Sequence, residues 1–277
     1  MTTKTIVITG ASDGIGAAAA RRLHHDGHRV VIVGRSPQKT DAVARELGAD
    51  RFVADFTRLD EVRTLAAELD AACPRIDVLA NNAGGVFGDR RKTADGFEQT
   101  FQINHLAPFL LTRLLLGKLI ASDASVLQTS SVAARIAARR LDLDDLDHDR
   151  SYSPIRAYGA AKLENILFTR ELHRRHHADG ISAVAFHPGN VASSFGSGTT
   201  SRVMRFFTHN PLARMALITP EKGADQLVWL AAGSAGADWQ PGLYYEKRKP
   251  AKRVNRQAYD AELATALWER SEQLLAR

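Results

Sequence analysis

The chain has 277 residues, of which 44% are hydrophobic and 25% charged, a balance that excludes a mainly disordered or collagen-like protein. Lysine and arginine number 37 against 31 aspartates and glutamates, a net charge of +6. Six of the cations lie in residues 247–256, which contain no acid, so the excess is local and argues against a broad nucleic-acid-binding surface. We expect a solvated loop there, with a contact to a partner, a membrane surface or the substrate entrance as the alternatives.

Cysteine content and hydropathy indicate the compartment. The single cysteine, Cys73, cannot form an internal disulfide, and the N-terminus runs into a strand-like segment without the apolar core of a signal peptide. The most hydrophobic stretch, His105–Ala121, contains Arg113 and Lys118 and is shorter than the ~20 residues that cross a bilayer. We therefore expect a cytoplasmic protein without a membrane span.

Short β-branched or aromatic runs alternate with helical patterns along the chain. The expected strands are Thr5–Ile8, Arg29–Val33, Arg51–Ala54, Ile76–Ala80, Ser125–Gln128, Ile181–Phe186 and a last one near Gly242–Tyr245. Between them, helical patterns such as Leu59–Ala72 carry an apolar stripe. This alternation predicts a single doubly wound Rossmann-type α/β domain over residues 1–277. Its mostly parallel seven-stranded sheet would lie between helices in three α/β/α layers.

Three glycines join the first strand to the first helix. Gly10, Gly14 and Gly16 follow the pattern G-x-x-x-G-x-G, which differs from the common G-x-G-x-x-G fingerprint of dinucleotide-binding folds. Glycines at such a turn let the backbone approach a phosphate, and the helix N-terminus offers it N–H groups. The alternative is that they only turn the chain.

Further motifs follow in a fixed order. They are Thr9–Gly16, Asn81–Gly84, Asn104, Ser130–Ser131, Tyr158–Lys162 and Pro188–Val191. This ordered set, over about residues 5–195, resembles the short-chain dehydrogenase/reductase family. The 26 residues between Ser131 and Tyr158, with the acidic stretch 141–149, are similar to the retinol-dehydrogenase and protochlorophyllide-reductase branch.

The end of the second strand indicates which nicotinamide cofactor is used. Gly34 and Arg35 stand where NAD-preferring enzymes usually carry an acid, and a guanidinium can bind a 2′-phosphate through two hydrogen bonds. NADP(H) is therefore favoured over NAD(H), the alternative being that Arg35 is only a solvated surface arginine. The resemblance implies the rest of the cofactor site, namely Gly10, Ser12, Asp13, Gly14, Ile15, Gly16, Asp55, Phe56, Asn82, Ala83, Gly84, Tyr158, Lys162, Pro188, Val191 and Ser193.

Tyr158 and Lys162 are four residues apart and share one helix face. A nearby ammonium favours the phenolate, so we expect Lys162 to lower the pKa of Tyr158 from its usual ~10. The resemblance implies that Tyr158 is the general acid/base and that Lys162 holds the nicotinamide ribose. It also implies that Ser131, rather than Ser130, binds the substrate oxygen and that Asn104 holds a water.

These residues predict an NADP(H)-dependent oxidoreductase that interconverts an apolar aldehyde or ketone and its alcohol. The alternatives are a catalytically inactive dinucleotide-sensing regulator of the same fold and a nucleic-acid binder. No metal is expected, because the i, i+4 pair His173 and His177 lacks an evident third ligand. Residues 193–219, apolar in their second half, would wall the substrate pocket or simply pack on the core. Homo-oligomerisation is left open.

Overall fold

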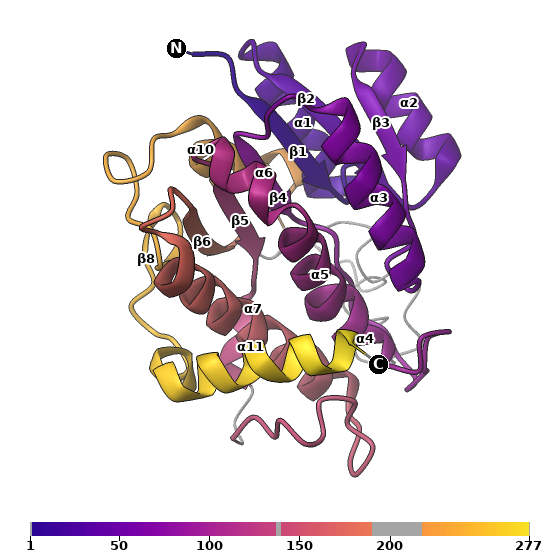
Figure 1. Cartoon of the computed structure of the whole chain (residues 1–277), viewed down its shortest axis with the longest axis vertical. Coiled ribbons are helices and arrows are strands. Elements are labelled where there is room, and N and C mark those ends of the chain that lie inside the picture. Colours follow the sequence, from indigo (N-terminus) through magenta and orange to yellow (C-terminus); the bar gives the residue numbers. More distant parts are fainter. Residues whose placement is uncertain (1, 137–139, 190–217, 277) are drawn as a thin grey trace.

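The computed structural model describes residues 2–136, 140–189 and 218–276. Within them one sheet has the strand order β3-β2-β1-β4-β5-β6-β7-β8 (Figure 1). Neighbouring strands run parallel from β3 to β7, and β8 pairs antiparallel with β7. The strands are β1 (Thr5–Thr9), β2 (Arg29–Gly34), β3 (Asp50–Val53), β4 (Val78–Asn81), β5 (Ser125–Thr129), β6 (Ser182–His187), β7 (Tyr244–Glu246) and β8 (Lys249–Pro250).

Helices cover both faces of this sheet. They are α1 (Gly14–His25), α2 (Pro37–Leu47), α3 (Leu59–Ala72), α4 (Gln99–Phe101), α5 (Ala107–Leu114), α6 (Leu116–Ala121), α7 (Pro154–His176), α10 (Pro220–Ala232) and α11 (Ala261–Leu275). Ile6 and Ile8 of β1 belong to the apolar cluster formed with α1, α2 and α10. Val7, between them, belongs to the cluster formed with α3, α5, α7 and α11. Successive strand residues thus point to opposite faces, and the predicted three-layer α/β/α fold is confirmed.

The strand order reverses between β1 and β4. From β1 the chain adds β2 and β3 on one side, and from β4 it adds β5, β6 and β7 on the other. In open parallel sheets, ligands bind beyond the carboxyl ends of the strands at this reversal. The glycine turn after β1 and the Asn82–Gly84 segment after β4 both begin there.

The C-terminal helix α11 packs against the helix α7, as Figure 1 shows in yellow. Its Trp268 is 2% exposed and lies in an aromatic cluster with Phe109 of α5 and Phe168 of α7, at centroid distances of 5.0 and 5.7 Å. Arg113 and Arg175 also contact the Trp268 ring, 5.4 and 4.9 Å from its centroid. These contacts hold α11 against α5 and α7. Tyr158 and Lys162 lie in α7, and Asn104 lies in the segment directly before α5.

The first four residues of the basic segment, 247–250, form the turn and second strand of a hairpin. The sequence predicted a solvated loop there and a sheet of seven strands. Lys249 and Pro250 form an eighth strand that pairs with Glu246 and Tyr245. The two turn residues, Lys247 and Arg248, have φ angles of +52° and +59°. Such left-handed turns usually carry Asn-Gly, so two long cations give no sequence signal for this hairpin.

Replacing Arg248 by glycine should stabilise the chain. A residue with a Cβ is strained at positive φ by ~1 kcal/mol, and glycine removes that strain while keeping the backbone N–H that donates to Gln226 Oε1 at 2.8 Å. We expect Arg248→Gly to raise the free energy of unfolding in urea by roughly 0.5–1 kcal/mol.

Lys249→Gly provides the matched control. Lys249 is an exposed neighbour in strand β8, where glycine only adds freedom to the unfolded chain. It should lower the free energy of unfolding, and equal effects of the two variants would contradict the strain argument.

Candidate active site

At the glycine turn, the backbone of Gly10 lies close to that of Ala83 and of Gly16. Gly10 and Gly14 have φ angles of +67° and +54°. A Cβ on Gly10 would lie 2.9 Å from the Cα of Ala83, and one on Gly16 would lie 2.3 Å from the carbonyl oxygen of Gly10. These positions therefore require glycine for packing as well as for any phosphate.

The segment after β4 is tied to the end of β1. The Thr9 hydroxyl accepts the backbone N–H groups of Asn82 and Ala83, each at 3.0 Å, and the Asn82 side chain donates to the Thr9 carbonyl at 3.0 Å. Asn82, predicted to bind the cofactor, thus uses its amide group to hold the two strand ends together. The N-terminus of α1, capped by Asp13 through Gly14 N at 2.7 Å, opens beside them.

Beyond β2 the side chains are cationic. Arg35 is exposed, and Gly34 makes room for Ser12, whose Cβ would lie 2.7 Å from a Cβ on Gly34. Lys39 of α2 forms a 2.7 Å ion pair with Asp13 at the same place. Sequence reasoning missed Lys39, since nothing in the linear order relates a lysine in the second helix to the acid before the first.

Asp55 and Phe56, two residues of the predicted cofactor site, differ in exposure. Asp55 is half-buried, and its carboxylate accepts the N–H of Thr57 at 2.9 Å. The Phe56 ring is 6% exposed and packs in the core between β1 and α3, so only its backbone is open to a ligand. The Phe56 side chain is used for packing, and the place of Phe56 in the cofactor site stays a prediction.

Ser131, Tyr158 and Lys162 come together beyond the end of β5. The Ser131 and Tyr158 hydroxyls share a hydrogen bond whose effect is to lower the pKa of Tyr158. The ammonium group of Lys162 lies 5.5 Å from the centroid of the Tyr158 ring and donates to the Thr129 carbonyl at 3.1 Å. Tyr158 and Lys162 thus lie on one face of α7, as their four-residue spacing predicted, and Tyr158 contacts Ser131.

Asn104 lies in a π-helical segment, Gln102–Leu106, between α4 and α5. Its amide nitrogen donates to the Gly85 and Thr100 carbonyls, at 3.0 and 2.9 Å, and its oxygen accepts Gly85 N–H at 3.2 Å. A Cβ on Gly84 would lie 2.6 Å from Asn104 Oδ1 and 3.3 Å from Lys162 Nζ. All four predicted catalytic residues therefore converge beside Gly84, and π-helical turns of this kind are frequent at functional sites.

Burial dominates the electrostatics of this cluster. It raises the pKa of Tyr158 above its usual value, and the hydrogen bond with Ser131 offsets this only in part. Burial also lowers the pKa of Lys162, which is 1% exposed, to about 7. The expected lowering of the Tyr158 pKa by Lys162 is thus wrong for this structure, because both groups are desolvated and the lysine carries less charge near neutral pH.

Tyr244 of β7 lies close enough to Tyr158 for the two hydroxyls to interact, and the sequence did not predict Tyr244, His187 or Glu246 as site residues. The Tyr244 hydroxyl is buried beside the Glu246 side chain. Burial raises the pKa of Tyr244, and the charges of Glu246 and Tyr158 add to the rise. Burial lowers the pKa of His187 to about 4. His187 and Glu246 lie at the carboxyl ends of β6 and β7, and this position was the available signal for them, whereas Tyr244 is the first residue of β7.

The remaining predicted residues divide into described and undescribed ones. Pro188 follows β6 and is half-buried. Val191, Ser193 and most of the predicted pocket wall 193–219 lie outside the described residues. In the acidic stretch 141–149, Asp147 accepts the N–H of Glu98 at 2.6 Å, and Asp149 pairs with Arg90. That stretch is therefore held against the loop before α4.

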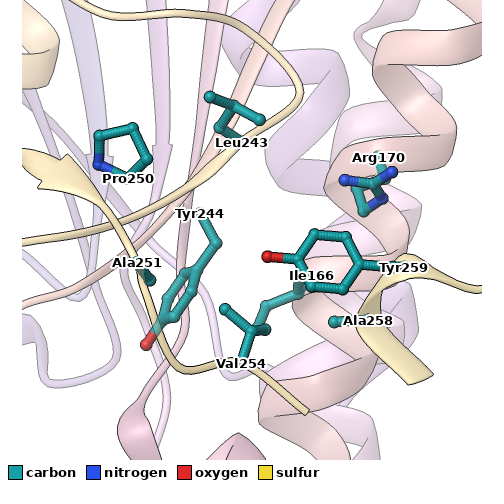
Figure 2. Close-up of a pocket in the computed structure, with 9 residues that line it drawn as sticks. All are labelled: Ile166, Arg170, Leu243, Tyr244, Pro250, Ala251, Val254, Ala258 and Tyr259. Atoms are coloured by element: carbon teal, nitrogen blue, oxygen red, sulfur yellow. The ribbon is translucent and has the colours of Figure 1, made fainter. Parts of the chain in front are cut away.

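A small apolar pocket lies between α7 and the chain after β8 (Figure 2). Ile166 and Arg170 of α7 line one side, and Tyr244, Val254 and Tyr259 are among the residues that face them. Its volume of about 40 Å³ is far below that of an ordinary ligand pocket, and neither Ser131 nor Tyr158 lines it. It is therefore not the substrate site.

The described residues form neither a metal-binding cluster nor a membrane-spanning helix. Among residues 2–136, 140–189 and 218–276, no three His, Cys, Asp or Glu side chains gather around a common point. The rings of His173 and His177 have centroids 4.5 Å apart and are tilted by 38° to each other. Within the same ranges, no helix combines the length and the apolar character needed to cross a bilayer.

Comparison with known proteins agrees with this geometry. A family model for short chain dehydrogenase matches residues 4–142. A protein of Streptomyces sp. (strain C5), provisionally named daunorubicin C-13 ketoreductase DnrU, is 45% identical over 97% of this chain and 91% of its own. Human retinol dehydrogenase 13 is 34% identical over 98% of this chain and 84% of its own. The chain belongs to the short-chain dehydrogenase/reductase family.

Solved structures of this family share the fold. An uncharacterised protein from Mycobacterium paratuberculosis has a TM-score of 0.76 and 35% identity, over 99% of this chain and 93% of its own. The Pseudomonas aeruginosa RhlG/NADP complex has a TM-score of 0.69 and 26% identity, over 88% and 94%. Together with the retinol dehydrogenases, these matches make the chain an oxidoreductase of the retinol-dehydrogenase-like branch, a family that binds nicotinamide dinucleotides.

The buried lysine should make stability depend on pH. Lys162 has a pKa of about 7 in the folded chain, against ~10.4 when unfolded, so between these values the unfolded chain holds more protons. The free energy of unfolding of the wild type should therefore rise with pH relative to Lys162→Met, by roughly 3 kcal/mol between about pH 7 and pH 10. Urea denaturation of both proteins checks this, and parallel curves would contradict it.

Proposed function

We propose that this chain is an NADP(H)-dependent oxidoreductase that interconverts an apolar aldehyde or ketone and its alcohol, with Tyr158 as the general acid/base. The observation that carries the proposal is the convergence of Asn104, Ser131, Tyr158 and Lys162 beside Gly84, where the strand order reverses. We propose further that residues 1–277 act as one domain.

The described residues fit a bound dinucleotide with a 2′-phosphate. The glycine turn and the N-terminus of α1 offer a backbone approach and a positive dipole end to the pyrophosphate. Arg35 and Lys39 supply positive charge beyond β2, where the adenine ribose would lie. The nicotinamide, when bound, supplies or accepts the hydride.

The protein's own groups would then manage the proton. Because burial raises the pKa of Tyr158, its phenol keeps a proton at neutral pH and can donate it to the carbonyl oxygen of a substrate. Ser131, already hydrogen-bonded to Tyr158, would bind the same oxygen. Lys162, whose ammonium lies 5.5 Å from the centroid of the Tyr158 ring, would hold the ribose hydroxyls.

The substrate class is supported by two observations. Two relatives are named a ketoreductase and a retinol dehydrogenase, and these names denote action on a ketone and on an alcohol. The buried Tyr244 hydroxyl near Tyr158 would offer one polar contact in the site. We propose that the segment 193–219 supplies apolar surface around such a substrate.

The tyrosine assignment is tested by Tyr158→Phe. This variant removes the proton donor while keeping the ring, so reduction of aldehydes and ketones by NADPH should fall by at least ~100-fold with NADPH binding nearly unchanged. Steady-state kinetics on a carbonyl panel and a fluorescence titration with NADPH measure the two quantities. Tyr259→Phe, at a ring that is 58% exposed, is the matched control and should keep wild-type rates.

NADPH consumption and DNA binding by the wild type separate the competing functions. A regulator that only senses the nucleotide would bind NADPH tightly but consume none with any carbonyl, quinone or alcohol offered. A salt-dependent affinity for DNA would favour a nucleic-acid binder. Substantial carbonyl reduction by Tyr158→Phe would show that Tyr158 is not the general acid/base.

The cofactor preference is tested by Arg35→Ala and Lys39→Ala. Each removes a cation near the proposed 2′-phosphate, so kcat/KM for NADPH should fall about tenfold or more while that for NADH stays the same. Arg45→Ala, at another exposed cation on α2, is the control. Equal or better wild-type rates with NADH than with NADPH would overturn the preference.

A further inference from the structure

We propose that Asn165, oriented by His105, positions Lys162 through a carbonyl oxygen that the two side chains share, that of Thr129. This inference rests on the proposed function in assigning Lys162 to the active site. The contacts that carry it are separate from the motif residues, and each can be removed by substitution.

The shared acceptor is at the end of strand β5. The ammonium of Lys162 donates to Thr129 O at 3.1 Å, and the amide nitrogen of Asn165 donates to the same oxygen at 3.0 Å. Both side chains are 1% exposed. A carbonyl oxygen has two lone pairs, so the two donors together occupy it and fix where the ammonium can lie.

A second bond joins the same two elements. The hydroxyl of Ser130, the serine not chosen as catalytic, donates to the backbone carbonyl of Lys162 at 2.6 Å. Residues 162–165 of α7 are thereby held against residues 129–130, directly before Ser131. The distance between Ser131 and Tyr158, one helical turn before Lys162, depends on this attachment.

His105 determines which way the Asn165 amide points. Its Nε2 lies 3.0 Å from the hydroxyl of Ser271 on α11. His105 Nδ1 and Asn165 Oδ1 are both buried and have no partner of standard hydrogen-bond geometry among the described residues, but the two side chains lie close enough to interact. In the proposed arrangement the Ser271 hydroxyl gives its one hydrogen to Nε2 rather than to the Leu267 carbonyl 2.8 Å away, so that Nδ1 carries the ring's hydrogen and turns it to Asn165 Oδ1.

The imidazole is uncharged, so it has one donor and one acceptor, and the partners of its two nitrogens decide which nitrogen is the donor. Burial lowers the pKa of His105 to about 3, against a smaller raising effect of its hydrogen bond with Asn165. The ring is therefore neutral at any working pH, with one donor and one acceptor. Asn165 then turns its oxygen to His105 and its NH₂ group to Thr129, which leaves the second lone pair of that carbonyl to Lys162.

The test removes the amide while keeping its volume. Asn165→Leu leaves the Thr129 carbonyl with one partner, so Lys162 should lose its fixed position. We expect kcat for NADPH-dependent reduction to fall about 10- to 100-fold and the Kd for NADPH to rise. We also expect the pH profile of kcat to shift, which a purely structural defect would not cause.

The matched control is Thr169→Val. Thr169 lies one turn further along the same helix, is 1% exposed, and its hydroxyl donates only within the helix, to Asn165 O at 2.8 Å. Its loss should leave kcat and the pH profile within about twofold of the wild type.

A double-mutant cycle tests the role of His105. His105→Phe keeps the ring among Phe101, Phe109 and Phe168 but removes its hydrogen bonds. It should lower kcat by about threefold to tenfold alone and add little in the Asn165→Leu background, because its effect passes through Asn165. Additive losses would contradict that order. Should Asn165→Leu fail to fold, His105→Phe alone still tests the pH profile.

A readout independent of activity separates this proposal from the proposed function. In a crystal structure of Asn165→Leu, Lys162 Nζ should have left the Thr129 carbonyl, and an unchanged separation would overturn the proposal. Wild-type kcat in Asn165→Leu, beside an inactive Tyr158→Phe, would overturn the positioning role alone. A wild type that reduces no carbonyl would overturn the proposed function, and the crystal structure would still decide the position of Lys162.

Discussion

The parallel sheet is buried on both faces, and this constraint decides where chemistry can take place. Side chains along β1, β2 and β4 alternate between two apolar clusters, so the strands themselves have no room for reactive groups. Polar residues gather instead at the carboxyl edge, beyond Thr9, Asn81 and Thr129. The four proposed catalytic residues meet there because a strand end, a π-helical segment and one helix converge on a glycine without a side chain.

Desolvation at that edge acts on acid and base in opposite directions. It raises the pKa of Tyr158 and lowers that of Lys162 to about 7, so the pair is poised as neutral phenol beside a partly charged amine. The shared Thr129 carbonyl offsets part of the cost of burying the lysine. The position of the Lys162 ammonium thus depends on its hydrogen bond with the Thr129 carbonyl as well as on the four-residue spacing from Tyr158.

Local patterns of spacing and polarity allowed the three layers and the mostly parallel sheet to be predicted, and the family resemblance implied the site formed by Ser131, Tyr158 and Lys162. The sequence did not reveal the Lys39 ion pair or the Asn165 contact, which join residues from separate elements. The direction of the Tyr158 pKa was also missed, since burial is a property of the packed structure. The basic hairpin was missed because its turn lacks the usual glycine.

The position of Ser271 has a consequence for how the protein is made. Strands, glycine turn and catalytic helix all leave the ribosome before α11, and domains fold largely in the order of synthesis. The hydrogen bond between Ser271 and His105, and the packing of Trp268 between Arg113 and Arg175, form only when that helix docks. A nascent chain that lacks α11 has all its motif residues but an unsupported imidazole, so maturation of the site is coupled to completion of the polypeptide.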